Sequence, residues 1–147
     1  MKDPIKATKE AYKNLLTDAV TYNGSTIPVF IGESNKAESN YYIIIGSISD
    51  ENNPNKHVFS SIVSVNIDVY AKVPNNMSDH FAAVDVMTEK VLELVLPSIG
   101  ETGLDYGTVF EVKSLQRQSS AQQTVDVTDA GRLVSRTTTF IQIINQL

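Results

Sequence analysis

The sequence predicts an α+β fold, a two-layer sandwich in which a mainly antiparallel sheet of about five strands carries two helices on one face. Three observations lead to this class. Residues 63–70 alternate between β-branched apolar side chains and Ser64, Asn66, Asp68 and Tyr70, which is typical of a half-buried strand. Residues 81–95 place apolar side chains at steps of three or four, as on one face of a helix. The other predicted strands follow one another through connections that favour antiparallel pairing.

The N-terminal segment predicts the first helix, of about four turns. Pro4 suits the first turn of a helix, and Asp3 before it is a suitable N-cap. Ala7, Ala11 and Leu15 begin an apolar stripe, and lysines occupy the opposite side. The stripe is expected to face the core, and the lysine face fits a solvated surface better than a contact with an acidic partner.

The next segment predicts a turn followed by two strands. Asn23-Gly24 is a strong turn signal. Residues 27–31 read as a short strand, and Pro28 places it at the start of a strand or at an edge of the sheet. Residues 41–48 are largely apolar, which favours a strand in the middle of the sheet.

Three polar segments are predicted to be loops: residues 33–40, 50–56 and 117–131. The second reads DENNPNK and is dense in charges and turn formers, so we expect it to project as a hairpin loop. The third is rich in Gln and Ser and is longer than an ordinary hairpin loop. Long loops in compact domains are often functional or disordered, which makes it a candidate contact region.

The C-terminal half predicts the second helix and the last two strands. Ser78 is expected to be the N-cap of this helix, and Pro97 to end it. Residues 98–107 hold three glycines and predict a mobile connection. Residues 108–116 and 133–144 then predict two strands.

Length and composition restrict the possible classes of protein. The chain has 147 residues and no visible repeat, which predicts one domain over 1–147. Its net charge of −5 argues against tight binding of nucleic acid. The absence of cysteine excludes disulfides, thiolate nucleophiles and cysteine metal sites. No apolar run is long enough to span a bilayer, so we expect a soluble protein made in a cytoplasm.

No motif for catalysis is visible. His57 and His80 lie outside any metal-binding spacing. Asp126, Asp129 and Gly131 match an EF-hand loop only in part, and we interpret the match as chance. We therefore expect no enzymatic activity, no cofactor and no metal.

Three segments together resemble bacteriophage tail-completion and tail-terminator proteins. Residues 27–49 (IPVFIGESNKAESNYYIIIGSIS) resemble the short strand, polar loop and apolar strand that follow the N-terminal helix in that family. Residues 61–96 are similar to its long strand, brief loop and amphipathic helix, and residues 132–144 (RLVSRTTTFIQII) to its closing strand. The glycine-rich stretch after the second helix and the Gln-rich segment depart from the family pattern.

The resemblance implies a structural protein of the virion, at the head–tail junction. Members of the family usually assemble as a ring of six around the DNA channel, cap the tail and dock to neck proteins. For this chain we expect a hexameric or dodecameric ring that docks to connector, neck and tail proteins. A mildly acidic subunit would let DNA pass without binding it specifically. Closing a ring requires a heterologous interface. We expect its contacts in the second and third predicted loops and at the residue that follows the third, namely at Asp50, Glu51, Asn52, Asn55, Lys56, Gln118, Gln122, Gln123, Asp126, Asp129 and Arg132.

Two other classes of function stay open at this point. One is a small cytoplasmic adaptor or inhibitor that binds a single protein through a sheet edge. The other, less favoured, is an enzyme or small-ligand binder that uses carboxylates in a pocket.

Overall fold

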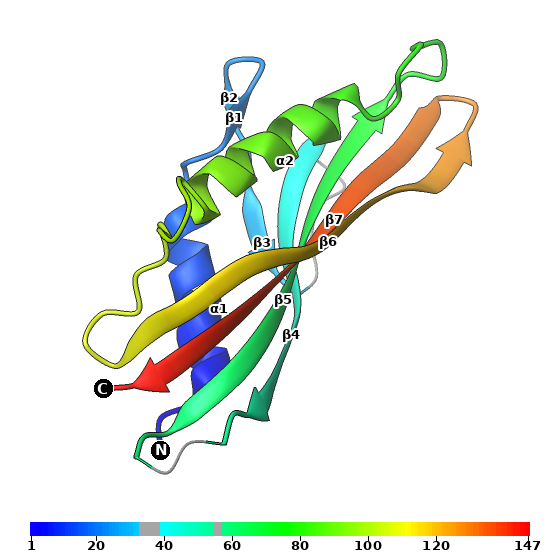
Figure 1. The fold of residues 1–147 in the computed structure, drawn as a ribbon. Coiled ribbons are helices and arrows are strands. Elements are labelled where there is room, and N and C mark those ends of the chain that lie inside the picture. Colours follow the sequence, from blue (N-terminus) through cyan, green and yellow to red (C-terminus); the bar gives the residue numbers. More distant parts are fainter. Residues whose placement is uncertain (33–38, 55–56) are drawn as a thin grey trace.

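Two helices and seven strands make up the part of the chain that the structure describes, residues 1–32, 39–54 and 57–147 of a computed structural model (Figure 1). Most of the predicted loop 33–40 and the candidate contacts Asn55 and Lys56 lie outside the described residues. The elements are α1 (Pro4–Leu16), β1 (Thr21–Tyr22), β2 (Ser25–Thr26), β3 (Val29–Ile31), β4 (Tyr41–Asn52), β5 (Ser60–Val73), α2 (Ala82–Val95), β6 (Phe110–Thr128) and β7 (Gly131–Gln146).

Five strands form one sheet in the order β3-β4-β5-β7-β6. β3 is an edge strand that follows Pro28 and runs parallel to β4, and every other neighbouring pair in this sheet is antiparallel. β1 and β2 form a separate hairpin around Asn23-Gly24, whose φ angles of 50° and 77° give the tight turn that the sequence predicts. The predicted fold class, an α+β domain with helices packed on a mainly antiparallel sheet, is confirmed.

Both helices pack against the same face of the sheet. Along β5 every second side chain from Ser61 to Val73 is buried, and the side chains between them are only half-buried. The buried set joins apolar residues of α1, α2 and β7 in one cluster. The other face, called the open face below, carries Ser64, Asn66 and Asp68 of β5. The alternation seen in the sequence therefore separates core from open face.

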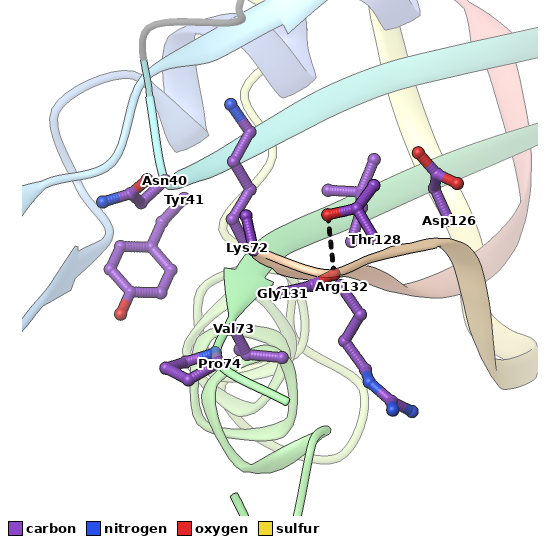
Figure 2. A pocket seen from close by; sticks show the side chains of 11 residues that line it. Asn40, Tyr41, Lys72, Val73, Pro74, Asp126, Thr128, Gly131 and Arg132 are labelled. Carbon is purple, nitrogen blue, oxygen red and sulfur yellow. Dashed lines mark hydrogen bonds between the residues drawn. The ribbon is translucent and has the colours of Figure 1, made fainter. Parts of the chain in front are cut away.

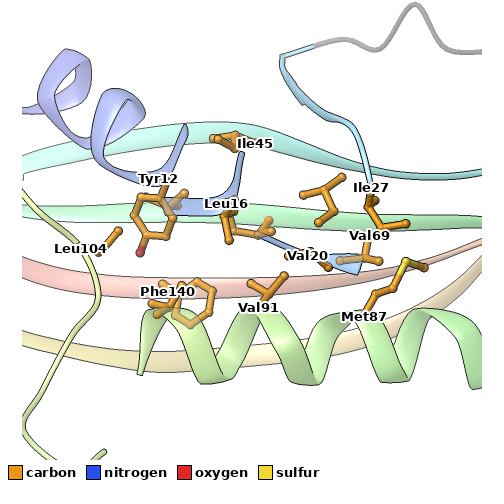
Figure 3. Packing of buried hydrophobic residues seen from close by; sticks show 14 of the residues in the cluster. Tyr12, Leu16, Val20, Ile27, Ile45, Val69, Met87, Val91, Leu104 and Phe140 are labelled. Atoms are coloured by element: carbon orange, nitrogen blue, oxygen red, sulfur yellow. The ribbon is translucent and has the colours of Figure 1, made fainter. Parts of the chain in front are cut away.

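Phe140 of β7 lies between the sheet and α2 in the buried cluster (Figure 3). Its side chain is fully buried, and the ring of Tyr12 from α1 lies beside it with centroids 6.0 Å apart. Met87 and Val91 extend from α2 towards the sheet and are also buried. Phe140 of the sheet thus contacts the helical layer and links it to the sheet.

α1 begins where the sequence predicts and ends earlier. Asp3 Oδ1 accepts hydrogen bonds from the backbone N–H groups of Ile5 and Lys6, at 2.9 and 3.2 Å, so the predicted N-cap is confirmed. The helix stops at Leu16 because Thr17 takes an extended conformation, with ψ of 126°, and Asp18 after it is left-handed, with φ of 60°.

The predicted N-cap of α2 is wrong. The helix begins at Ala82, with Phe81 in the cap position and no side-chain cap. Asp79 Oδ1 instead accepts a hydrogen bond from the backbone N–H of Phe81 at 3.0 Å, which stabilises a turn ahead of the helix and leaves Ser78 outside it. The end of the helix at Val95, before Pro97, agrees with the sequence.

The predicted loop over residues 117–131 is wrong. β6 continues to Thr128, and only Asp129 and Ala130 connect it to β7. This polar segment pairs with β7 over its whole length. Backbone hydrogen bonds between the two strands therefore stabilise the strand conformation, in place of apolar burial. The predicted loop 50–56 begins too early for the same reason, since residues 50–52 pair with residues 61–63 of β5.

The glycine-rich connection 98–107 has no regular secondary structure but is anchored to the core by Leu104 and Tyr106, both buried. The Tyr106 hydroxyl lies 3.0 Å from Thr8 Oγ1 and accepts a hydrogen bond from Gln142 Nε2 at 2.6 Å. Tyr12 in turn donates to Gln142 Oε1 at 2.8 Å. This buried network joins α1, β7 and the connection, and it satisfies polar groups that would be costly to bury alone.

Stability should fall in alkaline solution because of these two tyrosines. Burial raises the pKa of Tyr106 to about 12, against opposing hydrogen bonds from Thr8 and Gln142, and burial also raises the pKa of Tyr12 well above its usual range. The folded state favours the neutral phenols, so their contribution is complete below about pH 10 and is lost as pH rises towards 12. Urea unfolding between pH 9 and 12 should show this fall, and Tyr106→Phe should make it shallower; equal slopes would contradict the assignment.

Candidate interaction sites at the two ends of the sheet

A groove lies at the end of the sheet where the β6–β7 hairpin turns (Figure 2). Its volume is about 620 Å³. We call it the tip groove, and it is lined by Asn40, Tyr41, Lys72, Val73, Pro74, Asp126, Thr128, Ala130, Gly131, Arg132 and Leu133. The groove is built from three parts of the chain that are distant in sequence, namely the start of β4, the end of β5 and the hairpin tip.

Backbone contacts hold the hairpin tip against the end of β5. A Cβ atom placed on Gly131 would lie 2.6 Å from the carbonyl oxygen of Val73, so only glycine allows this approach. Asn75 Nδ2 donates to the carbonyl of Thr128 at 2.7 Å, and Asn75 Oδ1 accepts from Arg132 Nε at 3.2 Å. The end of β5 and the segment after it therefore hold the hairpin tip in place beside the tip groove.

The tip groove combines apolar walls with charged groups. Tyr41, Val73, Pro74 and Leu133 supply the apolar surface. Lys72 and Arg132 supply two cations, and Asp126 supplies one carboxylate. Such a lining suits an apolar side chain that is accompanied by negative charge.

β6 forms the outer edge of the sheet beside this groove. From residue 116 to residue 130 every side chain is exposed except that of Ser120, which is half-buried. Three register shifts against β7 each place one extra residue on β6, at Lys113, Gln118 and Val125. Bulges of this kind restrict how another strand can pair with an edge.

A polar network ties the middle of β6 to α2. Asp85 on α2 forms an ion pair with Arg136, whose Nη1 lies 3.0 Å from Asp85 Oδ1. The two carboxylate oxygens of Asp85 also accept hydrogen bonds from Gln122 Nε2, at 2.7 and 2.9 Å. Arg136 Nε also donates to Ser120 Oγ at 2.8 Å. This network thus connects α2 to the β6–β7 hairpin, and the side-chain NH₂ group of Gln122 already donates within the molecule.

The opposite end of the sheet carries exposed apolar side chains. Phe59 is 56% exposed, and its carbonyl accepts a hydrogen bond from the backbone N–H of Gln146 at 2.8 Å. Leu147 is 65% exposed and donates its N–H to the carbonyl of Val109, also at 2.8 Å. We call this group the apolar end cluster, and it consists of Met1, Val58, Phe59, Val109 and Leu147.

The sequence-predicted contact residues that the structure describes lie in three places. Asp126 and Arg132 both line the tip groove, and Asp129 lies in the turn of the hairpin. Asp50, Glu51 and Asn52 lie at the end of β4 that adjoins the start of β5, beside the apolar end cluster. Further along β6 are Gln118 at a bulge, Gln122 bonded to Asp85, and Gln123 on the open face opposite Ser135.

Sequence reasoning missed several residues at both ends. Tyr41, Lys72 and Pro74 line the tip groove but are ordinary strand and loop residues in the sequence. Their spacing in the sequence does not show that they are neighbours, because that depends on the register between β4 and β5. Phe59 did carry a signal, because it is an isolated aromatic residue after a polar segment.

No protein-family model matches the chain, and no curated protein sequence matches it. Within the ranges that the structure describes, no three His, Cys, Asp or Glu side chains are placed to hold a metal ion. The helices of the same ranges are all too short or too polar to cross a membrane.

Proposed function

We propose that this chain is a structural subunit of a bacteriophage head–tail junction, a tail-completion, tail-terminator or neck protein without enzymatic activity. In this proposal copies assemble as a hexameric or dodecameric ring around the DNA channel of the virion and dock to connector and tail proteins. The observation that carries it is the β6–β7 hairpin, which extends an ordered strand over residues 116–128 with almost all its side chains exposed.

The distal part of β6, residues 116–128, contributes no side chain to the apolar core. The last apolar residue of β6 that packs against the core is Leu115, and the strand continues for another thirteen residues to Thr128. Ordering an exposed polar strand costs conformational entropy that little burial offsets. A neighbouring subunit or ring that packs against the hairpin would recover burial, and this favours a chain that works within an assembly.

The charge of the subunit also supports a position beside DNA. The net charge of −5 repels phosphates at long range, and a channel of such subunits would let DNA slide. A DNA-binding subunit would instead need clustered cations.

The proposal is tested first by the mass of the purified protein over a range of concentrations, with negative-stain images of the largest species. We expect a closed hexameric or dodecameric ring, or a monomer that closes when a neck or tail component is added. A monomer that joins no such component would contradict the proposal. It would favour the adaptor or inhibitor class, for which the free edge of β6 offers a pairing surface.

Shortening the hairpin should block assembly and preserve the domain. Replacing residues 125–133 by Asn-Gly joins Thr124 to Val134, which are paired in the sheet, so the register of β7 is retained. A deletion of residues 119–124 alone would instead displace β6 along β7. Replacing only Asp129-Ala130 by Asn-Gly is the matched control, because it keeps the hairpin length. Circular dichroism should stay near wild type for both, and ring formation should be lost for the shortened chain alone.

A further inference from the structure

Two apolar surfaces lie at opposite ends of the same sheet. The apolar end cluster holds five of the eleven large hydrophobic side chains that are exposed in the described residues. The tip groove lies at the other end, since Val73 ends β5 and Ser60 begins it. The fourteen residues of β5 separate the two surfaces by about 40 Å. One molecule therefore cannot bring them together.

The shapes of the two surfaces are complementary. The end cluster projects Phe59 with more than half of its surface exposed, and Val58 beside it is 38% exposed. The tip groove is concave, with a volume of about 620 Å³, within the range of hollows that accept whole side chains. Its walls include Tyr41 and Pro74, against which an aromatic ring packs well.

The charges of the two surfaces are complementary as well. Asp50 and Glu51, both exposed, lie near the end of β4, on the side of the apolar end cluster. Lys2 and the ion pair between Lys113 and Glu111 lie at the same end of the sheet. Lys72 and Arg132 line the tip groove, with Asp126 as its carboxylate. An apolar projection with two carboxylates thus matches an apolar hollow with two cations.

We propose that the apolar end cluster of one copy docks into the tip groove of the next copy, with Phe59 as the inserted side chain. The occupant of the groove is a second copy of this chain, and this inference rests on the proposed ring. The contact is heterologous, because different surfaces of the two copies meet. Repetition of a heterologous contact gives a closed ring if the rotation between copies closes, and an open filament otherwise.

Cross-linking between copies tests the contact directly, since the chain contains no cysteine that would interfere. Phe59→Cys and Pro74→Cys are prepared as separate full-length proteins, both at exposed positions. They are oxidised mildly, alone and as a mixture. We expect a disulfide-linked dimer mainly in the mixture, because only there do the two thiols meet across the contact. Serine variants of the same two positions are the controls.

Charge reversal gives the second measurement. Adding Lys72→Glu and Arg132→Glu to the Pro74→Cys protein should lower the yield of mixed dimer about tenfold, because like charges then meet. Adding Asp50→Lys and Glu51→Lys to the Phe59→Cys protein should restore it. If Lys72→Glu and Arg132→Glu had only unfolded the first protein, substitutions in the second protein could not restore the yield of mixed dimer.

The outcomes separate this inference from the proposed function. A mixed dimer with loss and rescue supports the contact, whether or not closed rings are seen. A ring of wild-type protein without a cross-link in the mixture overturns the contact and leaves the ring proposal standing. If the wild-type protein stays monomeric and joins no neck or tail component, and the mixture of the two cysteine variants forms no dimer at the highest attainable concentration, both the contact and the ring are overturned. Equal cross-linking of either single variant alone would indicate a symmetric interface and would also overturn the contact.

Discussion

Phe140→Ala is expected to destabilise the fold by about 3–5 kcal/mol, the usual cost of removing a buried phenylalanine ring. Phe140 is fully buried, between the sheet and α2, and its ring lies 6.0 Å from that of Tyr12. The substitution removes the apolar surface of the ring and leaves a cavity that packed strands and helices fill only in part. Urea unfolding followed by circular dichroism measures the loss.

Ile141→Ala is the matched control for this prediction. Ile141 follows Phe140 in β7, but its half-buried side chain lies on the open face opposite Ser64. We expect a loss of roughly 1 kcal/mol, in proportion to the smaller area removed from water. A loss as large as that of Phe140→Ala would mean that the open face is covered in the folded monomer, which contradicts the arrangement of layers.

The periodic parts of the fold were predictable because buried positions need apolar side chains, and these recur in the sequence with the period of the strand or helix. In β5 the side chains of Val63, Val65 and Ile67 alternate with polar ones, and the structure buries the first set and half-exposes the second. In α2 the buried residues Val84, Met87 and Val91 follow the helical spacing. The fold class and both elements follow from these patterns alone.

The distal half of β6 was not predictable in the same way. Gln122, Gln123 and Thr124 have exposed side chains, so no apolar period marks them as a strand. Their strand conformation depends on pairing with β7, which is a long-range property that a local pattern does not contain. Asp126 was therefore predicted to be a contact residue in a loop and Arg132 one directly after it, whereas the structure places both in the wall of the tip groove.

Gly131 shows how a local motif can mislead. In the sequence it occupies the glycine position of a partial EF-hand pattern. In the structure it has φ of 150° and lies against the carbonyl of Val73, where a Cβ atom would come within 2.6 Å. A second strand that approaches the hairpin tip explains this glycine, and no ion is needed to explain it.

Gly131→Ala is accordingly expected to cost about 2–3 kcal/mol, from the strained φ and the collision with Val73 together. The carbonyl it meets belongs to the backbone, so the tip has to move away from β5. The hydrogen bond from Asn75 to Thr128 should weaken with that movement, and amide exchange of residues 128–132 should accelerate.

Gly107→Ala separates the two causes. Gly107 also has a positive φ, of 63°, but an added Cβ atom would meet nothing within 4 Å. This control should cost only about 1–2 kcal/mol, from backbone strain alone, and should leave the tip groove intact. Gly131→Ala should therefore reduce cross-linking between Phe59→Cys and Pro74→Cys proteins when it is added to the second, and Gly107→Ala should not. Equal effects of the two substitutions on stability and on cross-linking would show that the close approach of the hairpin tip to Val73 does not shape the groove.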